Sequence, residues 1–131
     1  MRSPVVRPSC TEEEPTVEES FGTVIRRART DLGLSQRELA KMLRVDFTYL
    51  SKLENDRADY AAKEDVIRSI AQHLELDEES LVFLAGRTPQ RYEQFLKKHH
   101  REMPKLFQRM AENPAFAEQV FRAASGEGKL R

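Results

Sequence analysis

The sequence is poor in the residues on which membrane, secreted and metal-binding proteins depend. Its one cysteine, Cys10, cannot form an internal disulfide, and no histidine lies near it to complete a metal site. No apolar run approaches the ~18 residues of a membrane span, and the N-terminus lacks the basic and then apolar pattern of a signal segment. We therefore expect a soluble, cytoplasmic protein that makes no contact with a membrane.

The sequence also lacks recognisable arrangements of catalytic residues. The histidines are His73, His99 and His100, and the adjacent pair would point about 100° apart on a helix, which does not suit a shared metal ion. The carboxylates are scattered, with no pair set against an aromatic pocket that would separate their pKa values. We expect no enzymatic activity, no catalytic residue, no bound metal and no cofactor.

Charge is balanced in total but segregated along the chain. Lysine and arginine number 22, and aspartate and glutamate also number 22. The net charge is −3 over residues 1–20, +3 over 21–57, −5 over 58–86 and +5 over 87–131. This alternation is compatible with an ordinary solvated surface, but the basic stretches also suit contact with nucleic acid.

The two ends of the chain do not have the pattern of folded elements. The first 20 residues, MRSPVVRPSCTEEEPTVEES, combine prolines and glutamates with no periodic apolar face, so they bury too little surface to offset the entropy of ordering. We expect a disordered acidic tail over 1–20 and a flexible C-terminus over 125–131.

Residues 21–86 have the periodicity of five short helices. The first is predicted between the cap Ser20 and the stop signal Gly33. Its inward positions are Phe21, Val24, Ile25, Ala28 and Leu32. The second begins with a capping box formed by Ser35 and Glu38. Its inward positions are Leu39, Ala40 and Leu43.

The third helix is predicted over 46–55, with Asp46 as its cap and Leu50 and Leu53 facing inward. The fourth is predicted over 63–74, and the fifth follows the cap Asp77. Inward positions in these two helices are Val66, Ile67, Ile70, Ala71, Leu74, Leu81, Leu84 and Ala85. Five helices in this length predict a compact all-α domain.

Residues 87–124 predict further short helices in the segments TPQRYEQFLKKHH, MPKLFQRMAE and NPAFAEQVFRAASG. Their apolar residues are Tyr92, Phe95, Leu96, Met103, Leu106, Phe107, Met110, Phe116, Val120 and Phe121. Helices this short are unstable alone, so they must pack on the first domain or on a second copy of the chain. We favour the second copy, and thus a dimerisation segment, because the bundle over 21–86 already accounts for its own apolar faces.

The stretch over 34–55 has the features of two helices joined by a tight turn, the second carrying outward polar and aromatic side chains at its start. Such a helix fits the major groove of DNA. The sequence GLSQRELAKMLRVDFTYLSKLENDR resembles the phage-repressor (Cro-like, xenobiotic-response-element) family of helix-turn-helix transcriptional regulators, and the similarity covers 21–86. The resemblance implies a five-helix, lambda-repressor-like DNA-binding domain followed by a short helical dimerisation segment.

The resemblance also implies roles for single residues. Base contacts are implied for Phe47, Thr48, Ser51 and Lys52. Contacts to DNA phosphates are implied for Gln36, Arg37, Tyr49, Asn55 and Arg57. A structural ion pair is implied between Arg29 and Glu54. The competing interpretations are that Phe47 and Tyr49 belong to the core and that Lys52 is an ordinary solvated lysine.

The patterns and the resemblance together imply a sequence-specific transcriptional regulator of the bacterial or phage type, associated with the nucleoid. In the favoured interpretation it is a dimeric repressor that inserts helix 46–55 into the major groove of a palindromic, double-stranded DNA operator. In one alternative it is an antitoxin whose C-terminal segment neutralises a toxin. In another it is a repressor that a separate metallopeptidase inactivates by clipping that segment.

Overall fold

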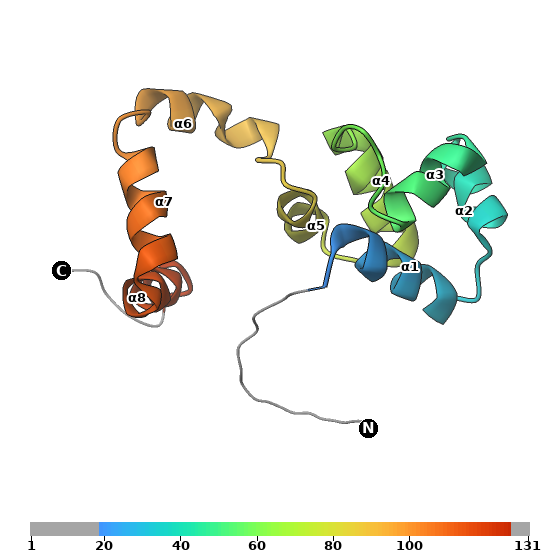
Figure 1. The fold of residues 1–131 in the computed structure, drawn as a ribbon, viewed down its shortest axis with the longest axis horizontal. Helices are drawn as coiled ribbons and strands as arrows, with labels where there is room; N and C mark the ends of the chain where they lie inside the picture. Colours follow the sequence, from blue (N-terminus) through green and yellow to red (C-terminus); the bar gives the residue numbers. More distant parts are fainter. Residues whose placement is uncertain (1–18, 127–131) are drawn as a thin grey trace, which may run out of the picture. The chain divides into compact units, whose positions relative to one another are not determined.

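The structure is a computed structural model that describes residues 19–126. Its secondary structure consists of helices joined by short loops (Figure 1). The disordered tail expected over 1–20 lies outside the described residues except for its last two. The flexible C-terminus expected over 125–131 lies outside them except for its first two. Residues 19–126 contain no strand, so the all-α prediction is confirmed.

The chain divides into two compact units, the first ending at Pro89 and the second beginning at Gln90. The first contains α1 (Phe21–Asp31), α2 (Gln36–Leu43), α3 (Phe47–Glu54), α4 (Glu64–Leu74) and α5 (Glu78–Leu84). The second contains the 3-10 turn η1 (Gln90–Tyr92), α6 (Glu93–Lys98), α7 (Met103–Glu112) and α8 (Pro114–Ala124). The five helices expected over 21–86 are all present.

Side-chain caps start five of these helices where the sequence predicts a start. The hydroxyl of Ser20 accepts a hydrogen bond from the Thr23 amide at the start of α1. Ser35 and Glu38 form the complete capping box of α2. The caps of α3, α5 and α8 are Asp46, Asp77 and Asn113. Each satisfies a backbone amide that the helix itself leaves without a partner.

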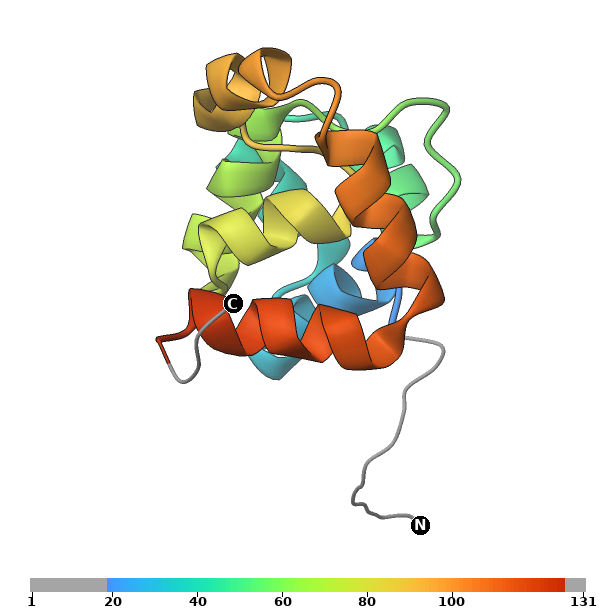
Figure 2. The same cartoon turned by 90° about the vertical axis from the view of Figure 1, so that its left-hand side faces the viewer.

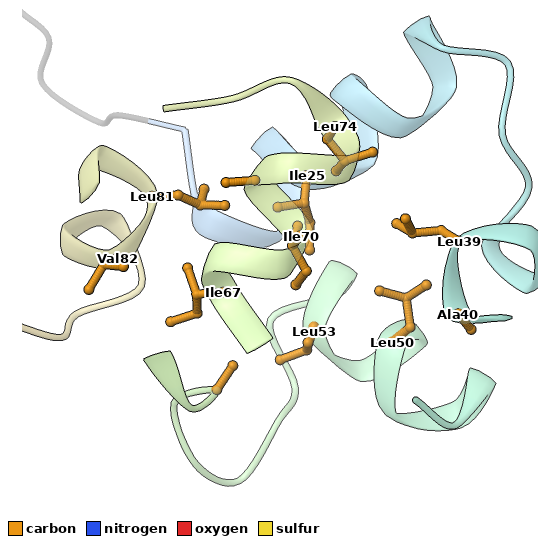
Figure 3. Close-up of a cluster of buried hydrophobic side chains, with 12 residues drawn as sticks. Ile25, Leu39, Ala40, Leu50, Leu53, Ile67, Ile70, Leu74, Leu81 and Val82 are labelled. Carbon is orange, nitrogen blue, oxygen red and sulfur yellow. The ribbon is translucent and has the colours of Figure 1, made fainter. Parts of the chain in front are cut away.

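The core of the first unit surrounds α4, which packs on α1, α2 and α5, while α3 packs on α1 and α2 (Figure 3). Its buried apolar residues are Ile25, Leu39, Ala40, Leu50, Leu53, Ala62, Ile67, Ile70, Ala71, Leu74, Leu81 and Val82. Because α2 and α3 each contribute two of these residues, the core fixes the two helices relative to each other.

Two residues that we expected to face inward are exposed. Leu84 is 39% exposed and Leu32 is 42% exposed. Leu32 lies just beyond the last residue of α1, where the chain turns through Gly33 at a φ of 75°. In α5 the buried face contains Leu81 and Val82, a small rotation from the expected face. A helix of two turns has too few apolar residues for its periodicity to fix that rotation.

Helices α7 and α8 of the second unit pack against each other across the Asn113 turn (Figure 2). None of the helical residues of this unit is buried. Its most exposed large apolar side chains are Phe95, Phe107 and Phe121, with exposures of 55%, 59% and 59%. In its described part, over 90–126, the unit therefore exposes apolar rings and has no buried helical residue.

Candidate nucleic-acid interface

The turn between α2 and α3 is short and fixed by backbone geometry. Arg44 follows α2 with a φ of 61°, the left-handed conformation for which glycine is the usual residue. The Val45 amide then donates to the Ala40 carbonyl at 3.0 Å. Asp46 accepts from the Thr48 amide at 2.9 Å and begins α3. Two helices joined by so few residues form a helix-turn-helix.

The outward face of α3 presents Thr48 and Lys52, which are both exposed and lie one turn apart. The opposite face carries Leu50 and Leu53, which are buried. Ser51 is half-buried. The core thus holds the helix by one side, and polar groups able to donate or accept hydrogen bonds remain on the other. This is the arrangement that a groove-reading helix needs.

The two aromatic residues at the start of α3 have an intermediate environment. Phe47 and Tyr49 are half-buried and pack against the edge of the core. The Arg37 guanidinium of α2 stacks over the Phe47 ring at 4.3 Å from its centroid. Arg37 is predicted to contact a DNA phosphate and Phe47 to contact a base, and both roles stay predictions.

Glu54 lies at the centre of a buried polar network at the end of α3. Its carboxylate accepts from Arg29 Nε at 2.7 Å and from Arg29 Nη2 at 2.9 Å, the two-point geometry that favours an arginine. Arg29 Nη1 also donates to the Leu34 carbonyl at 2.7 Å. The predicted Arg29–Glu54 pair is therefore present, and it connects α1 and the start of α2 to α3.

Gln36 and Asn55, both expected to contact phosphates, are held by this network. Gln36 Nε2 donates to Glu54 Oε1 at 2.8 Å, which occupies one of its two hydrogens. Asn55 Nδ2 donates to the Ser51 carbonyl at 2.9 Å. Asn55 Oδ1 accepts from Arg26 Nη2 at 2.6 Å. The two amides, from α2 and from the end of α3, are thus fixed relative to each other.

Arg57, the last residue expected at a phosphate, follows α3 and is exposed. Its amide donates to the Lys52 carbonyl at 2.8 Å, which holds the backbone close to the end of the helix. The structure thus brings the expected DNA-contacting residues onto α2, α3 and the residues that follow α3.

Sequence reasoning missed the contact between the start of α1 and the end of α3. The Asp56 carboxylate accepts from the Gly22 amide at 2.9 Å and from the Ser20 hydroxyl at 2.7 Å. Asp56 itself has a φ of 56°. Its carboxylate lies at the positive end of α1, where a negative charge is favourable. No local signal in the sequence pairs positions this far apart.

In the part of the chain that the structure describes, no group of histidine, cysteine or acidic side chains could hold a metal ion. No helix there is both long and apolar enough to cross a membrane. A groove of about 560 Å³ opens on the first unit, lined by residues of α1, α5 and the loop after α3.

Residues 25–81 match the family model HTH_3, described as helix-turn-helix. No match was found among curated proteins. The structure is similar to the clp gene regulator ClgR from C. glutamicum, with 32% identity over 56% of this chain and 92% of that chain and a TM-score of 0.43.

Two further solved structures are similar. A second structure of the clp gene regulator ClgR from Corynebacterium glutamicum has 24% identity over 78% of this chain and 99% of that chain, with a TM-score of 0.44. A chain of the SinR protein/SinI protein complex has 18% identity over 75% of this chain and 97% of that chain, with a TM-score of 0.44.

Proposed function

Since the chain belongs to the helix-turn-helix family of DNA-binding transcription regulators, we propose that it is a dimeric repressor that places α3 in the major groove of a palindromic operator. The observation that carries this proposal is the division of α3 into two faces. Leu50 and Leu53 anchor it, while Thr48 and Lys52 extend outward from a helix whose position the Glu54 network fixes.

The outward side chains suit the edges of bases. The Thr48 hydroxyl can donate or accept, and its methyl group can contact a thymine methyl. Lys52 donates only, which suits the acceptor edge of guanine. Phe47, covered by Arg37, offers an apolar edge at the start of the same helix. These groups would read sequence, and the groups at the ends of α2 and α3 would fix the helix on the DNA backbone.

Dimerisation is supported by the apolar surface of α7 and α8. Phe107 and Phe121 are each 59% exposed, and burying such rings gains roughly 1.5–3 kcal/mol each. A second copy presents the same surface, so a two-fold interface could bury both rings of both chains. The two copies of α3 in the dimer would then contact half-sites about 34 Å apart on one side of the DNA.

The proposed reading role is tested by fluorescence anisotropy. The purified protein is titrated onto labelled DNA from upstream of its own gene and onto a scrambled duplex of the same composition. We expect tight binding to the natural sequence only, and a loss of about tenfold or more for the Thr48→Ala/Lys52→Ala variant, because each good base contact contributes roughly 1–3 kcal/mol.

The matched control is Thr30→Ala/Lys41→Ala, which removes the same two residue types from exposed positions on α1 and α2. It should bind the natural sequence as the wild type does. Equal binding of the wild type to both duplexes would contradict groove reading by α3 at this DNA. Co-purification with an unrelated small protein, in place of a homodimer, would favour the antitoxin alternative.

A further inference from the structure

Arg26 connects α1 to the end of α3, beside residues with predicted phosphate contacts. Its Nη2 donates to the Glu54 carbonyl oxygen at 3.0 Å and to Asn55 Oδ1 at 2.6 Å. Its Nε lies 3.8 Å from Glu54 Oε1. No feature of the sequence had suggested a role for this arginine in binding DNA.

Arg26 shares its acidic partner Glu54 with Arg29, so one carboxylate faces two guanidinium groups. The Glu54 carboxylate is fully buried and already forms two short hydrogen bonds with Arg29, so its charge is balanced there. The Asp56 carboxylate is bound by the Gly22 amide and the Ser20 hydroxyl at the start of α1. The side chain of Arg26 is 45% exposed, so its charge faces solvent.

The hydrogen-bonding groups of Arg26 and Asn55 leave donors for an anion. Among the contacts of Arg26 within residues 19–126, both hydrogen bonds use Nη2, so the two N–H groups of Nη1 remain available. The Asn55 carboxamide is held at Oδ1 by Arg26 and at Nδ2 by the Ser51 carbonyl. The hydrogen bond to Ser51 uses one of the two Nδ2 hydrogens, which leaves the second as a donor. A charged donor and a neutral donor therefore lie side by side on the surface.

We propose that Arg26 and Asn55 form a binding site for one phosphodiester group of the DNA backbone, in which Arg26 supplies the charge and also holds the Asn55 carboxamide in place. Arginine suits this role because its planar guanidinium can donate to two acceptors at once. The inference rests on the proposed DNA binding and adds a contact from α1 to those of α2 and α3.

The test is the salt dependence of DNA binding, measured by fluorescence anisotropy on one duplex at salt concentrations from about 50 to about 300 mM. Each phosphate contact adds roughly 0.9 to the slope of log affinity against log salt. The proposed dimer carries two copies of this site, so Arg26→Gln should lower the magnitude of the slope by about 1.8 and weaken binding about thirtyfold at 0.15 M salt. Asn55→Ala should weaken binding with a smaller change in slope, because it removes a neutral donor.

The matched control is Arg27→Gln, on the same helix and also exposed, whose guanidinium pairs with Glu19 instead. It should keep the wild-type slope. An unchanged slope in Arg26→Gln, or an equal decrease in Arg27→Gln, would overturn the proposal. If the wild type binds no duplex at all, the proposed function fails first, so the two failures are distinguishable.

Arg26→Lys separates charge from geometry and serves if Arg26→Gln loses its helical circular dichroism. Lysine keeps the positive charge but lacks the fork that reaches Glu54, Asn55 and a phosphate together. We expect a slope close to that of the wild type with binding several-fold weaker at every salt concentration. Binding as tight as that of the wild type would show that the guanidinium has no special role and would overturn the proposed site.

Discussion

At the scale of single residues, Gly22 is the point at which α1 approaches the end of α3. A Cβ atom there would lie 2.5 Å from the Glu54 carbonyl oxygen and 2.6 Å from that of Leu53. Both atoms belong to the backbone and cannot move away cheaply. We expect Gly22→Ala to lower the free energy of unfolding by about 1–3 kcal/mol, despite the better helix propensity of alanine, as measured by urea unfolding.

Gly33→Ala is the matched control for that substitution. Gly33 has a φ of 75° but no atom within 4 Å of a Cβ, so alanine there would meet backbone strain alone, of about 1 kcal/mol. A Gly22→Ala protein as stable as the wild type would show that the two helices are not held as closely as described. It would also contradict a close contact between the Asp56 carboxylate and the start of α1.

The buried Arg29–Glu54 pair leads to a second residue-scale prediction. Arg29→Met would remove the two-point partner of a fully buried carboxylate and leave it only the Gln36 amide and Arg26 Nε at 3.8 Å, so we expect a loss of about 3–5 kcal/mol of stability. Adding Glu54→Leu should recover much of that loss, because the unpaired charge is then gone. Urea unfolding of both single variants and the double variant measures the coupling, and strictly additive losses would contradict it.

At the scale of secondary-structure elements, the predictable features are those encoded within a few residues. The caps Ser20, Ser35 and Asp46 each bind an amide two or three positions ahead, so the sequence alone indicates them. The exposure of Leu84 could not be predicted in the same way, because α5 is too short for its pattern to fix a rotation. Likewise, the contact of Asp56 with the start of α1 and the Arg26–Asn55 contact join distant positions and depend on tertiary packing.

The cap of α5 predicts a dependence on pH. Hydrogen bonds from Ser80 to the carboxylate lower the pKa of Asp77 below its ordinary value of 3.8. A depressed pKa in the folded state means that the cap contributes stability above the unfolded pKa and that this contribution is lost as pH falls through the folded value. Melting temperature measured from pH 6 down to about pH 2 should therefore fall less steeply for Asp77→Asn, which keeps a capping oxygen but does not titrate.

Glu75→Gln is the control in that experiment, because it removes one carboxylate from an exposed position at the end of α4. Its melting curve should follow that of the wild type across the same pH range. Parallel curves for Asp77→Asn and the wild type would show that the charge of the cap contributes nothing to the acid sensitivity of the fold.

At the scale of the whole molecule, the two units differ in how far they satisfy their own apolar surface. The first has a buried core that the periodic pattern over 21–86 indicated in large part. The pattern missed the core residues Ala62 and Val82, and it placed the exposed Leu32 and Leu84 inside. The second has helices where the sequence predicted them, yet none of their residues is buried. Sequence periodicity shows that such a face must be covered, but it does not specify the surface that covers it.

The proposed dimer interface on α7 and α8 can be tested by removing its two most exposed rings. Phe107→Ser/Phe121→Ser should shift the protein from dimer to monomer in sedimentation at micromolar concentration, and should weaken operator binding with it, because each monomer then binds one half-site alone. The first unit should keep its helical content, since neither ring belongs to its core.

Phe83→Ser is the matched control, because Phe83 is 53% exposed but lies on α5 in the first unit. It should leave the dimer intact if α7 and α8 form the interface. A dimer that survives the double substitution but dissociates on Phe83→Ser would assign the interface to α5 and contradict the proposal. Operator binding lost in the double variant without a change in mass would instead assign the two phenylalanines a role in contacting DNA or in stabilising the fold, and would separate dimerisation from repression.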